Sequence, residues 1–402
     1  MKIAIMNTFY DGGGAEKVSR QLFEKLTNKN NIETYFVAGI KRGVNEKNKV
    51  EYLYSSIIRK KINFIYAALT NHGRMHDKNA LKKVINFIEE EQIDILHINN
   101  LHEDYLGIED IEQISRHCRI IWTMHDMWNI TGHCSHSFEC QQWKKGCKKC
   151  TNWNSYPKIH YDNVKKMYDA KKQAFTGKQI KFVMPSKWLY NIAKESFLKN
   201  EQLRLVYNGV DTEKFQCLDK TKIKRKYNIQ KRSILFVAAD INNPFKGISC
   251  LLKALRYIEN YKDYCILIVG ANSKDIRQEI AHFDIIEFGY IQDEKMLNQI
   301  YAAADVFVIP SLAENFPCVV LEAMASGTPV IGAKVGGIPE AIGSTGWSFE
   351  AGNEIDLYNA IEKAFQNLDI LRMKGLESRK KVENYFSENK MLQNYIEIYN
   401  EM

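Results

Sequence analysis

The chain has no apolar run long enough to cross a membrane. A transmembrane helix needs about 18 or more consecutive apolar residues, and no stretch of the sequence supplies them. The N-terminus, MKIAIMNTFYDGGG, has only a short apolar run before Asp11, which is typical of a first β-strand and not of a secretory signal. Internal repeats and low-complexity tracts are also absent. These absences exclude membrane-spanning and repeat proteins, and we expect the chain to remain in the cytoplasm.

The length and composition are those of an ordinary globular protein with two domains. Hydrophobic residues make up 45% and charged residues 26% of the sequence, which is usual for a chain that buries a core. A chain of 402 residues is long enough for two domains, each with its own core. A turn sequence, Asn-Gly-Val-Asp, occupies residues 208–211. We therefore expect a domain boundary close to residue 204.

Short apolar strands alternate with helical patterns along the whole chain. Repeated alternation of this kind implies parallel sheets with right-handed crossover connections. A helix is expected at about 15–26, and an aromatic helical pattern covers 383–402. The expected strands are 2–6, 34–38, 94–98, 119–124, 181–184 and 203–207, followed by 234–238, 265–269, 285–288, 306–309 and 329–331.

Charge is unevenly distributed between the two halves. Residues 1–200 hold 32 Lys and Arg against 21 Asp and Glu, a net charge of +11, whereas residues 201–402 hold 24 against 27, a net charge of −3. Basic pairs such as Lys148-Lys149, Lys165-Lys166 and Lys171-Lys172 recur in the first half. They indicate either solvated helix faces or attraction to an anionic membrane surface or a phosphate-bearing acceptor. No nucleic-acid-binding module is recognisable, so no nucleic acid partner is expected.

The segment from Glu314 to Glu322, ENFPCVVLE, carries two carboxylates eight residues apart. A buried strand at 305–309 precedes it. Pro317 suits the first position of the following helix, because it has no N–H to leave unpaired there, and Gly327 is placed to end that helix. The first glutamate therefore lies on a loop at the carboxyl end of a strand, and the second lies on a helix. A glutamate in a surface loop and another in a helix are common in proteins, so the pair alone is equally compatible with a purely structural role.

Several backbone groups near these carboxylates suit a phosphate. The N–H groups of Cys318 and Val319 lie at a helix start, which favours anions, and face the crevice where open parallel sheets bind ligands. Lys246 precedes Gly247 at the end of another strand and adds a positive charge. The glycines at 12–14 would let backbone N–H groups approach a diphosphate or acceptor closely, although a plain tight turn is the alternative. Together these residues predict a nucleotide-sugar site.

Three histidines follow or lie within expected strands of the first half. His125 comes directly after the strand 119–124, which predicts a position at the sheet edge facing the cleft between the domains. The alternative is a core histidine bonded to a neighbour. His97 lies within an apolar strand and is compatible with simple packing, while His102 follows that strand and is compatible with contact to an acceptor.

Four of the nine cysteines fall within 17 residues of one another. The last two form a C-x2-C pattern, which zinc sites use, and disulfides are not expected in a reducing cytoplasm. His133 or His136 could replace one ligand, and an iron–sulfur cluster or four free thiols are the alternatives. A closed site of this kind would be structural and not catalytic. The sequence predicts a structural zinc bound by Cys134, Cys140, Cys147 and Cys150.

The second half resembles family 4 of the retaining glycosyltransferases, which have the two-domain GT-B fold. The segment around Trp128 and its cysteines resembles a polysaccharide-biosynthesis branch of that family, and the first half as a whole resembles the family more weakly. The resembling stretches are YNGVD (207–211), FKG (245–247), VG (269–270), FGYI (288–291), ADVFVIPSLAENFPCVVLEAMASGTPVI (304–331) and GGIPE (336–340), with GGGAEK (12–17), DILHINNLH (94–102) and TMHDMWNITGHC (123–134) in the first half.

The resemblance implies roles for individual residues. Glu314 corresponds to the carboxylate near the donor sugar, Glu322 to the ligand of the ribose hydroxyls and Lys246 to a ligand of the diphosphate. His125 corresponds to the histidine that approaches the reacting face. The expected catalytic residues are therefore Glu314 and His125, and the expected donor-binding residues are Lys246, Glu322, Asn315, Phe316, Cys318, Val319, Tyr290, Ile291, Gly13 and Gly14.

The chain departs from the family pattern at two positions. The family usually has an Arg a few residues before the diphosphate-binding Lys, but residues 238–245 contain none. Asn242, Asn243 or a basic residue from elsewhere could take part of that role. The family also often has a Gly where this chain has Pro317, which changes one backbone donor at the helix start.

The resemblance implies an α/β protein with two Rossmann-like domains whose parallel sheets face a cleft. Residues 1–204 would form an acceptor-binding domain and 205–383 a nucleotide-sugar-binding domain, with a final helix at 384–402 that packs back on the first domain. The implied function is retaining transfer of a hexosyl group from a nucleotide-diphosphate sugar to a glycan or lipid-linked acceptor in cell-surface polysaccharide synthesis. No cofactor is required for this chemistry, and the protein could associate with the inner membrane face.

Two other function classes remain open from the sequence alone. A sugar-nucleotide epimerase of the GT-B fold would share the nucleotide crevice and release a free sugar nucleotide. A zinc-containing nucleic-acid-binding protein would use the basic first half. The phosphate-binding pattern lies in the acidic half, which argues against the second alternative.

Overall fold

The computed structural model divides the chain into two compact units. It describes all residues except 30, 42–47, 55–64, 66–77, 102–104 and 273. Unit 1 comprises Met1–Val206 and Leu392–Met402, and unit 2 comprises Tyr207–Met391. The expected boundary after residue 204 lies two residues from the observed division.

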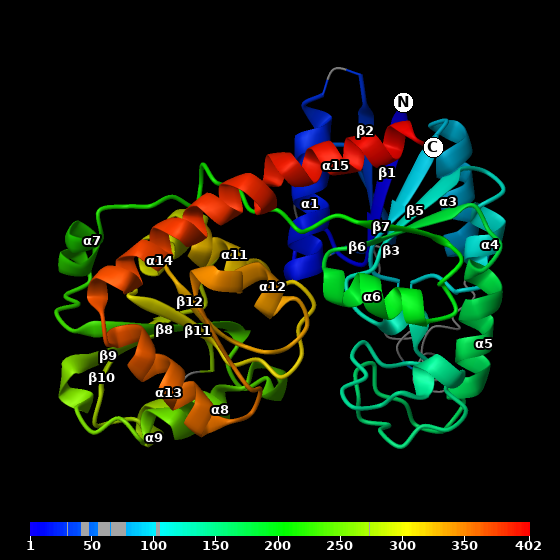
Figure 1. Cartoon of the computed structure of the whole chain (residues 1–402). Helices are drawn as coiled ribbons and strands as arrows, with labels where there is room; N and C mark the ends of the chain where they lie inside the picture. Colours follow the sequence, from blue (N-terminus) through cyan, green and yellow to red (C-terminus); the bar gives the residue numbers. More distant parts are fainter. Residues whose placement is uncertain (30, 42–47, 55–64, 66–77, 102–104, 273) are drawn as a thin grey trace. The chain divides into compact units, whose positions relative to one another are not determined.

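Unit 1 is built on a sheet of seven parallel strands. The strand order is β3-β2-β1-β4-β5-β6-β7, so the chain runs outward from β1 in one direction and then returns to continue from β4 in the other. Helices cover both faces of the sheet in Figure 1. The elements are β1 (Lys2–Asn7), α1 (Gly14–Thr27), β2 (Glu33–Ile40), β3 (Val50–Tyr54), α3 (Lys78–Glu90), β4 (Ile95–Ile98), α4 (Asp110–Ile114), β5 (Arg119–Thr123), α5 (Val164–Phe175), β6 (Ile180–Met184), α6 (Lys187–Glu195) and β7 (Gln202–Leu205).

Unit 2 repeats this topology with six parallel strands in the order β10-β9-β8-β11-β12-β13. The reversal of direction here lies between β8 and β11. The elements are α7 (Lys220–Lys226), β8 (Arg232–Asp240), α8 (Ile248–Leu255), β9 (Tyr264–Ala271), α9 (Lys274–Glu279), β10 (Asp284–Gly289), α10 (Glu294–Ala303), β11 (Val306–Ile309), α11 (Cys318–Ala325), β12 (Val330–Ala333), α12 (Ile338–Ile342), β13 (Trp347–Phe349), α13 (Glu354–Phe365) and α14 (Leu368–Lys381).

The sheet of unit 2 is buried on both faces. Ile234 and Phe236 of β8 pack into one apolar core, whereas Leu235, between them, packs into a second core. Alternate residues of a strand point to opposite faces, so a strand covered on both sides must be apolar throughout. This requirement explains the short, continuous apolar runs that predicted the strands. The two parallel sheets confirm the predicted α/β class with two Rossmann-like domains.

The boundaries differ from the prediction in a few places. β3 and β13 were not predicted, because β3 follows a polar stretch and β13 has only three residues. Pro317 is the residue before α11 and has an extended backbone, so its predicted place as the first helical residue was wrong by one position. Gly327 has a φ of 76° just after the helix, as expected for a glycine that ends it.

The C-terminal segment is not one helix. A π-helical turn covers Val382–Phe386, and α15 (Glu388–Asn400) follows it after Ser387. Ser387 forms a β-bridge with Val210 inside unit 2. Only the end of the chain, Leu392–Met402, which includes the last part of α15, groups with unit 1, so the segment that belongs with the first domain is shorter than the predicted 384–402.

Candidate functional site

The predicted donor-binding residues of unit 2 flank the point where its strand order reverses. Lys246 follows β8, and Glu314 follows β11, the neighbouring strand of the sheet. Carboxyl ends of parallel strands meet at one edge of a sheet, and the reversal leaves a crevice there in which ligands bind. The topology therefore brings together two residues that are 68 positions apart in the sequence.

Lys246 and Glu314 form a partly buried ion pair. The Lys246 Nζ donates to Glu314 Oε1 at 2.7 Å, and the Ser311 hydroxyl donates to the same oxygen at 3.1 Å. The Glu314 side chain is 12% exposed and the Lys246 side chain 33%. A cation and a carboxylate are thus held side by side at the edge of the sheet. A diphosphate that enters here would compete with Glu314 for the lysine.

Glycines permit the close backbone contacts that position this pair. Gly247 has a φ of 67°, and a Cβ built on it would lie 1.9 Å from the carbonyl oxygen of Pro310. Gly336, with a φ of 55°, would place a Cβ 1.9 Å from the carbonyl oxygen of Glu314. Any side chain at either position would push the loop away. The loops after β8 and β12 are therefore pressed against the loop that carries Glu314.

The start of α11 lies directly after this loop. Cys318 and Val319 are the first two helical residues, and N–H groups in the first turn have no partner four residues earlier in the helix. The loop is fixed on the other side by Asn208, whose side-chain amide donates to the carbonyl oxygen of Phe316 at 2.9 Å. Gly337 N donates to the carbonyl oxygen of Asn315 at 2.6 Å. The predicted phosphate-binding backbone is thus held by contacts from two other segments.

Glu322 lies on the buried side of α11. It is 3% exposed, and the hydroxyl of Tyr301 donates to its Oε2 at 3.2 Å. Burial raises the pKa of Tyr301 well above 10, and the charge of Glu322 adds to the effect, so the tyrosine remains a hydrogen-bond donor at neutral pH. The two glutamates of the segment therefore have different surroundings, one paired with a lysine and the other with a tyrosine.

The remaining predicted residues of unit 2 lie at the ends of other loops. Tyr290 follows β10 and is 57% exposed, and Ile291 beside it is partly buried against the core. Asn243 accepts a hydrogen bond from the N–H of Phe245 and so caps the short helical turn that carries Lys246. Asn243 therefore has a local structural role in the stretch that lacks the arginine.

Tyr207 supports the site and was not predicted as a site residue. Its ring packs on Phe316 with centroids 5.1 Å apart, and its hydroxyl donates to Glu340 Oε2 at 3.2 Å. Tyr207 and Glu340 lie in the YNGVD and GGIPE stretches, so their place in the family pattern was the available signal. Their contacts across 133 residues could not be read from either stretch alone.

Unit 1 places a glycine-rich loop at the equivalent edge of its sheet, between β1 and α1. Gly13 precedes α1 and Gly14 is its first residue. Neither has a positive φ, and a Cβ on Gly14 would meet no atom within 4 Å, so the surrounding chain does not require glycine there. The room above the helix start is compatible with a ligand close to the backbone.

His125 is held by Asn99, a residue that the sequence analysis missed. Asn99 follows β4, and its Oδ1 lies 2.8 Å from His125 Nε2. Its amide nitrogen donates to the carbonyl oxygen of Met6, and its own carbonyl oxygen accepts from Trp122 Nε1. An Oδ1 acceptor favours the His125 tautomer that carries its proton on Nε2.

His97 is a buried structural residue, as the packing interpretation predicted. Its Nδ1 lies 2.7 Å from the Tyr399 hydroxyl and its Nε2 2.7 Å from the Thr123 hydroxyl, which in turn bonds Tyr395. Complete burial lowers the pKa of His97 to about 3. The network ties the end of α15 to the sheet of unit 1. His102 lies outside the described residues.

The four clustered cysteines share one loop region between β5 and α5. Burial raises the pKa of Cys134 to about 11 and of Cys147 to about 12, and neighbouring thiols of the cluster contribute to both shifts. Cys150 Sγ lies 3.3 Å from His133 Nε2. All four are unpaired by disulfides. As the side chains stand, the described part of the chain contains no group of three His, Cys, Asp or Glu arranged to hold a metal ion, so the zinc remains a prediction.

Lys171 lies in the centre of this loop region. Its side chain is fully buried, and its Nζ donates to the carbonyl oxygens of Trp128 at 2.5 Å and Thr131 at 3.1 Å. The Nζ also lies 3.7 Å from the centroid of the Trp128 ring. Burial lowers the pKa of Lys171 to about 7. The pair Lys171-Lys172 was interpreted as surface charge, and for Lys171 that interpretation is wrong, because a single long side chain organises the loop from inside.

Two family models match most of the chain. The model described as "Glycosyltransferase Family 4" matches residues 12–214, and the model "Glycosyl transferases group 1" matches 231–367. Together they span both units. No helix in the described ranges is both long and apolar enough to pass through a bilayer.

Individual relatives agree with these models. The chain is 22% identical over 415 aligned residues to the "Putative colanic acid biosynthesis glycosyl transferase WcaC" of Escherichia coli, with 99% of each chain covered. It is 27% identical to the "N-acetyl-alpha-D-glucosaminyl L-malate synthase" of Bacillus anthracis over 52% of this chain and 57% of that protein. The first similarity extends over both units.

Solved structures share the fold over the full length. Sucrose-phosphate synthase from Thermosynechococcus elongatus superposes with a TM-score of 0.75 at 18% identity, covering 100% of this chain and 98% of that one. Anabaena HepE in complex with UDP superposes with a TM-score of 0.70 at 15% identity, covering 100% of both chains. These similarities place the two Rossmann-like units in the GT-B fold class. The chain belongs to glycosyltransferase family 4.

Proposed function

We propose that the protein transfers a sugar from a nucleoside-diphosphate sugar to a glycan or lipid-linked acceptor, with retention of the anomeric configuration. The observation that carries this proposal is the Lys246–Glu314 ion pair beside the start of α11. A lysine and a helix start suit a diphosphate, and a carboxylate suits sugar hydroxyls. The structures of HepE with UDP support a nucleotide donor for this fold.

In this proposal unit 2 stabilises the leaving group. The bond between the anomeric carbon and the diphosphate oxygen breaks, and negative charge grows on the diphosphate. Lys246 and the N–H groups of Cys318 and Val319 offset that charge, which is electrostatic stabilisation in a prepared site. Glu314, released from Lys246, faces the donor sugar. The family resemblance assigns the ribose to Glu322, whose buried carboxylate accepts from Tyr301 and would have to turn from it to reach a ligand, and the base to Tyr290 and Ile291.

The second half of the reaction is bond formation to the acceptor. The acceptor hydroxyl attacks the face that the diphosphate leaves, and its proton passes to the departing diphosphate. His125 of unit 1, oriented by Asn99, is assigned to the donor sugar, as the family resemblance implies. Exclusion of water from the site would suppress hydrolysis of the donor.

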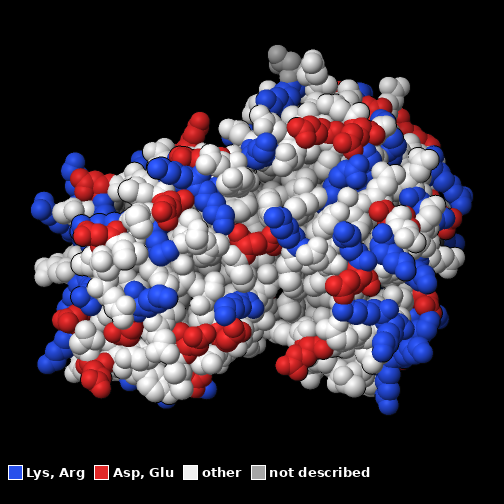
Figure 2. All heavy atoms as spheres, in the orientation of Figure 1, with Lys and Arg blue, Asp and Glu red and all other residues white. Residues whose placement is uncertain are grey.

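Polysaccharide synthesis at a membrane is the setting that fits the acceptor best. The similarity to WcaC, named as a putative glycosyl transferase of colanic acid biosynthesis, extends over 99% of this chain. A lipid-linked acceptor would lie at the inner membrane face, and the net charge of +11 in the first half favours an anionic surface. Figure 2 shows Lys and Arg gathered on the side of unit 1 that carries α5.

The proposal is tested first by a panel of nucleoside diphosphates in a thermal-shift assay. A nucleotide that raises the melting temperature identifies the donor base, and transfer assays with its sugar nucleotides follow. NMR of the product then reads the anomeric configuration. Lys246→Ala should abolish the nucleotide shift, and Lys253→Ala, which removes an exposed lysine of α8 outside the site, should keep it. An isomerised donor formed without any acceptor would instead establish the epimerase.

A further inference from the structure

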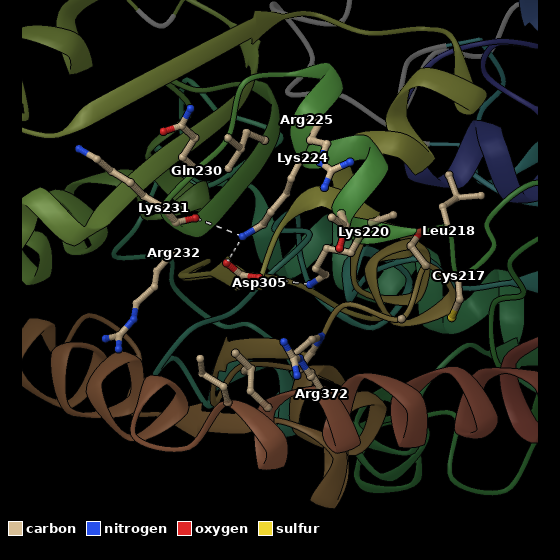
Figure 3. A pocket seen from close by; sticks show the side chains of 18 of the residues that line it. Cys217, Leu218, Lys220, Lys224, Arg225, Gln230, Lys231, Arg232, Asp305 and Arg372 are labelled. Carbon is tan, nitrogen blue, oxygen red and sulfur yellow. Dashed lines mark hydrogen bonds and ion pairs between the residues drawn. The ribbon is translucent and has the colours of Figure 1, made fainter.

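A hollow in unit 2 lies at the opposite edge of the sheet from the Lys246–Glu314 pair. Its volume is about 810 Å³, and α7 and α14 contribute residues to its walls (Figure 3). Arg232 begins β8, and Asp305 immediately precedes β11, so both lining residues lie at the amino ends of these strands. Lys246 and Glu314 follow the carboxyl ends of the same strands. The hollow is therefore separate from the donor site.

The α7 side of the hollow is strongly basic. Residues 220–232 contain seven Lys and Arg and no Asp or Glu, although the second half of the chain has a net charge of −3. Deep in the hollow, Lys220 and Lys224 pair with Asp305, at 3.4 and 2.6 Å. Arg225 of α7 and Arg372 of α14 also line the hollow (Figure 3) and are exposed, and Arg372 Nη1 lies 3.8 Å from the exposed Asp369 Oδ1. Lys222 and Lys231 are also paired, with Asp219 and Asp284. Lys and Arg still outnumber the carboxylates around the hollow, and the exposed members of this excess can reach a large anionic partner.

The α14 side exposes apolar side chains. Leu368, Ile370, Met373 and Leu376 are 44%, 43%, 50% and 60% exposed, and Leu368 and Leu376 line the hollow. The opposite side of α14 explains why these residues remain outside. Gly375 packs so closely on the turn after α11 that a Cβ would lie 2.2 Å from the carbonyl oxygen of Gly327. The helix is therefore anchored by one face. The four exposed apolar side chains point outward among the charged side chains of Asp369, Arg372 and Glu377.

We propose that this surface, termed the α7–α14 face and formed by Arg225, Arg372, Leu368, Met373 and Leu376, docks on an anionic lipid bilayer. Exposed apolar residues on a helix enter the boundary between headgroups and acyl chains. Lys and Arg beside them bind anionic headgroups. The combination suits a bilayer, because the apolar side chains can enter the acyl-chain boundary while the basic side chains contact the anionic headgroups.

Other occupants fit this surface less well. A second copy of the chain, placed symmetrically on the same face, would bring the two basic segments 220–232 together, and like charges across an interface repel. A small free anion would use the basic groups but leave Leu376 and Met373 in water. A bilayer is the partner that complements the charge and the apolar face together.

The test is flotation of the full-length protein with phosphatidylcholine vesicles, with and without phosphatidylglycerol. We expect binding to the anionic vesicles that weakens with salt. Arg225→Gln with Arg372→Gln should weaken binding about 25-fold, since each basic residue near the surface contributes about a factor of five. The matched control, Lys253→Gln with Lys262→Gln, removes two charges from unit 2 outside the hollow and should bind like the parent protein.

The apolar part has its own matched pair of variants. Leu376→Ser should weaken binding to anionic vesicles several-fold, whereas Ile355→Ser, at a residue of similar exposure on α13 (54%), should not. Circular dichroism and thermal melting confirm that each variant is folded. Equal binding of the parent to neutral and anionic vesicles, or unchanged binding of both α7–α14 variants, would overturn the proposal. A dimer in light scattering that Leu376→Ser dissociates would show that a second copy covers the face instead.

Flotation needs neither a sugar donor nor an acceptor, so its outcome is independent of the proposed transferase reaction. A variant in which Lys148, Lys149, Lys165 and Lys166 of unit 1 are replaced by Gln measures how much the basic first half contributes to vesicle binding. Loss of binding in that variant alone would assign the bilayer contact to unit 1 and reject the α7–α14 face.

Discussion

Units 1 and 2 share a strand order, yet they place different chemistry at the same topological point. In unit 2 the strands on either side of the reversal end in a lysine and a glutamate that form an ion pair. In unit 1 the corresponding loops carry glycines and Asn99, which holds His125. The ion pair in unit 2 suits a diphosphate. In unit 1 the loop after β1 also carries Asp11, which pairs with Arg20, and the amide of Asn99 suits sugar hydroxyls.

The two halves of the chain also differ in net charge. The basic first half has a net charge of +11 and the second half −3, but the charge that matters for binding is local. In unit 2 the α7 region is basic within an acidic half, and in unit 1 one of the predicted surface lysines, Lys171, is buried. Net charge therefore does not show which surface meets an anion.

The largest expected effect is the loss of the charged pair in unit 2. Lys246→Ala and Glu314→Gln should each lower kcat by about 10²–10³-fold, the scale seen when a group that stabilises transition-state charge is removed. Steady-state transfer assays measure it. If either variant kept kcat within a factor of two of the parent protein, the ion pair of unit 2 would have no part in the reaction, and the proposed difference between the two units would be wrong.

The second effect is on nucleotide affinity. Glu322→Ala removes a charged hydrogen-bond acceptor and should weaken nucleoside-diphosphate binding by about 1.5–3 kcal/mol, read by isothermal titration calorimetry. Tyr301→Phe is the control, because it removes the hydroxyl that donates to Glu322 and keeps the carboxylate. Equal weakening by both variants would mean that the carboxylate acts through packing and not through the ribose.

In unit 1 the expected effect is on orientation. Asn99→Ala should free the His125 ring and lower kcat by up to about 10²-fold, the scale of a small misplacement in a reacting complex. The double variant with His125→Ala should be no slower than His125→Ala alone, because the two residues act as one unit. Additive losses in this double-mutant cycle would show that Asn99 acts independently of His125.

Loss of zinc from the cysteine loop should destabilise unit 1 and leave nucleotide binding by unit 2 nearly unchanged. Purified protein should contain about one zinc per chain, and Cys147→Ser with Cys150→Ser should release it and lower the melting temperature of unit 1. Nucleotide affinity should change little. Cys217→Ser, at an exposed cysteine of unit 2, is the matched control. Metal-free protein from a chelator-free preparation, by elemental analysis, would refute the zinc.

The last effect is a pH dependence of stability from His97, which is small near neutral pH and grows toward acid pH. Its folded-state pKa of about 3 lies below the usual 6.5 because the ring is buried, so the unfolded state binds a proton first as pH falls. Stability from this group is complete above about pH 6.5 and is lost progressively toward pH 3, by up to about 1.4 kcal/mol per pH unit. Urea unfolding at several pH values measures the slope. His97→Gln should flatten it, and an unchanged slope would exclude His97 as the cause.

The sequence alone determined the fold class and predicted most of the residues of one candidate site. Continuous apolar runs are required in strands that are covered on both faces, so the periodicity of β8 and β11 predicted parallel sheets. Glu314, Cys318, Val319 and Glu322 lie within nine residues, and their place between a strand and a helix followed from local rules for Pro and Gly. Lys246 was predicted in the same way, from the glycine beside it.

Only the tertiary structure decided what each of these residues contacts. The pairing of Lys246 with Glu314 depends on β8 and β11 being neighbours, which no local pattern encodes. The same holds for Asn99 with His125, for Tyr207 with Glu340 and for the burial of Lys171 under the cysteine loop. Each contact joins segments that are distant in the sequence, and long-range packing, not local propensity, brings them together.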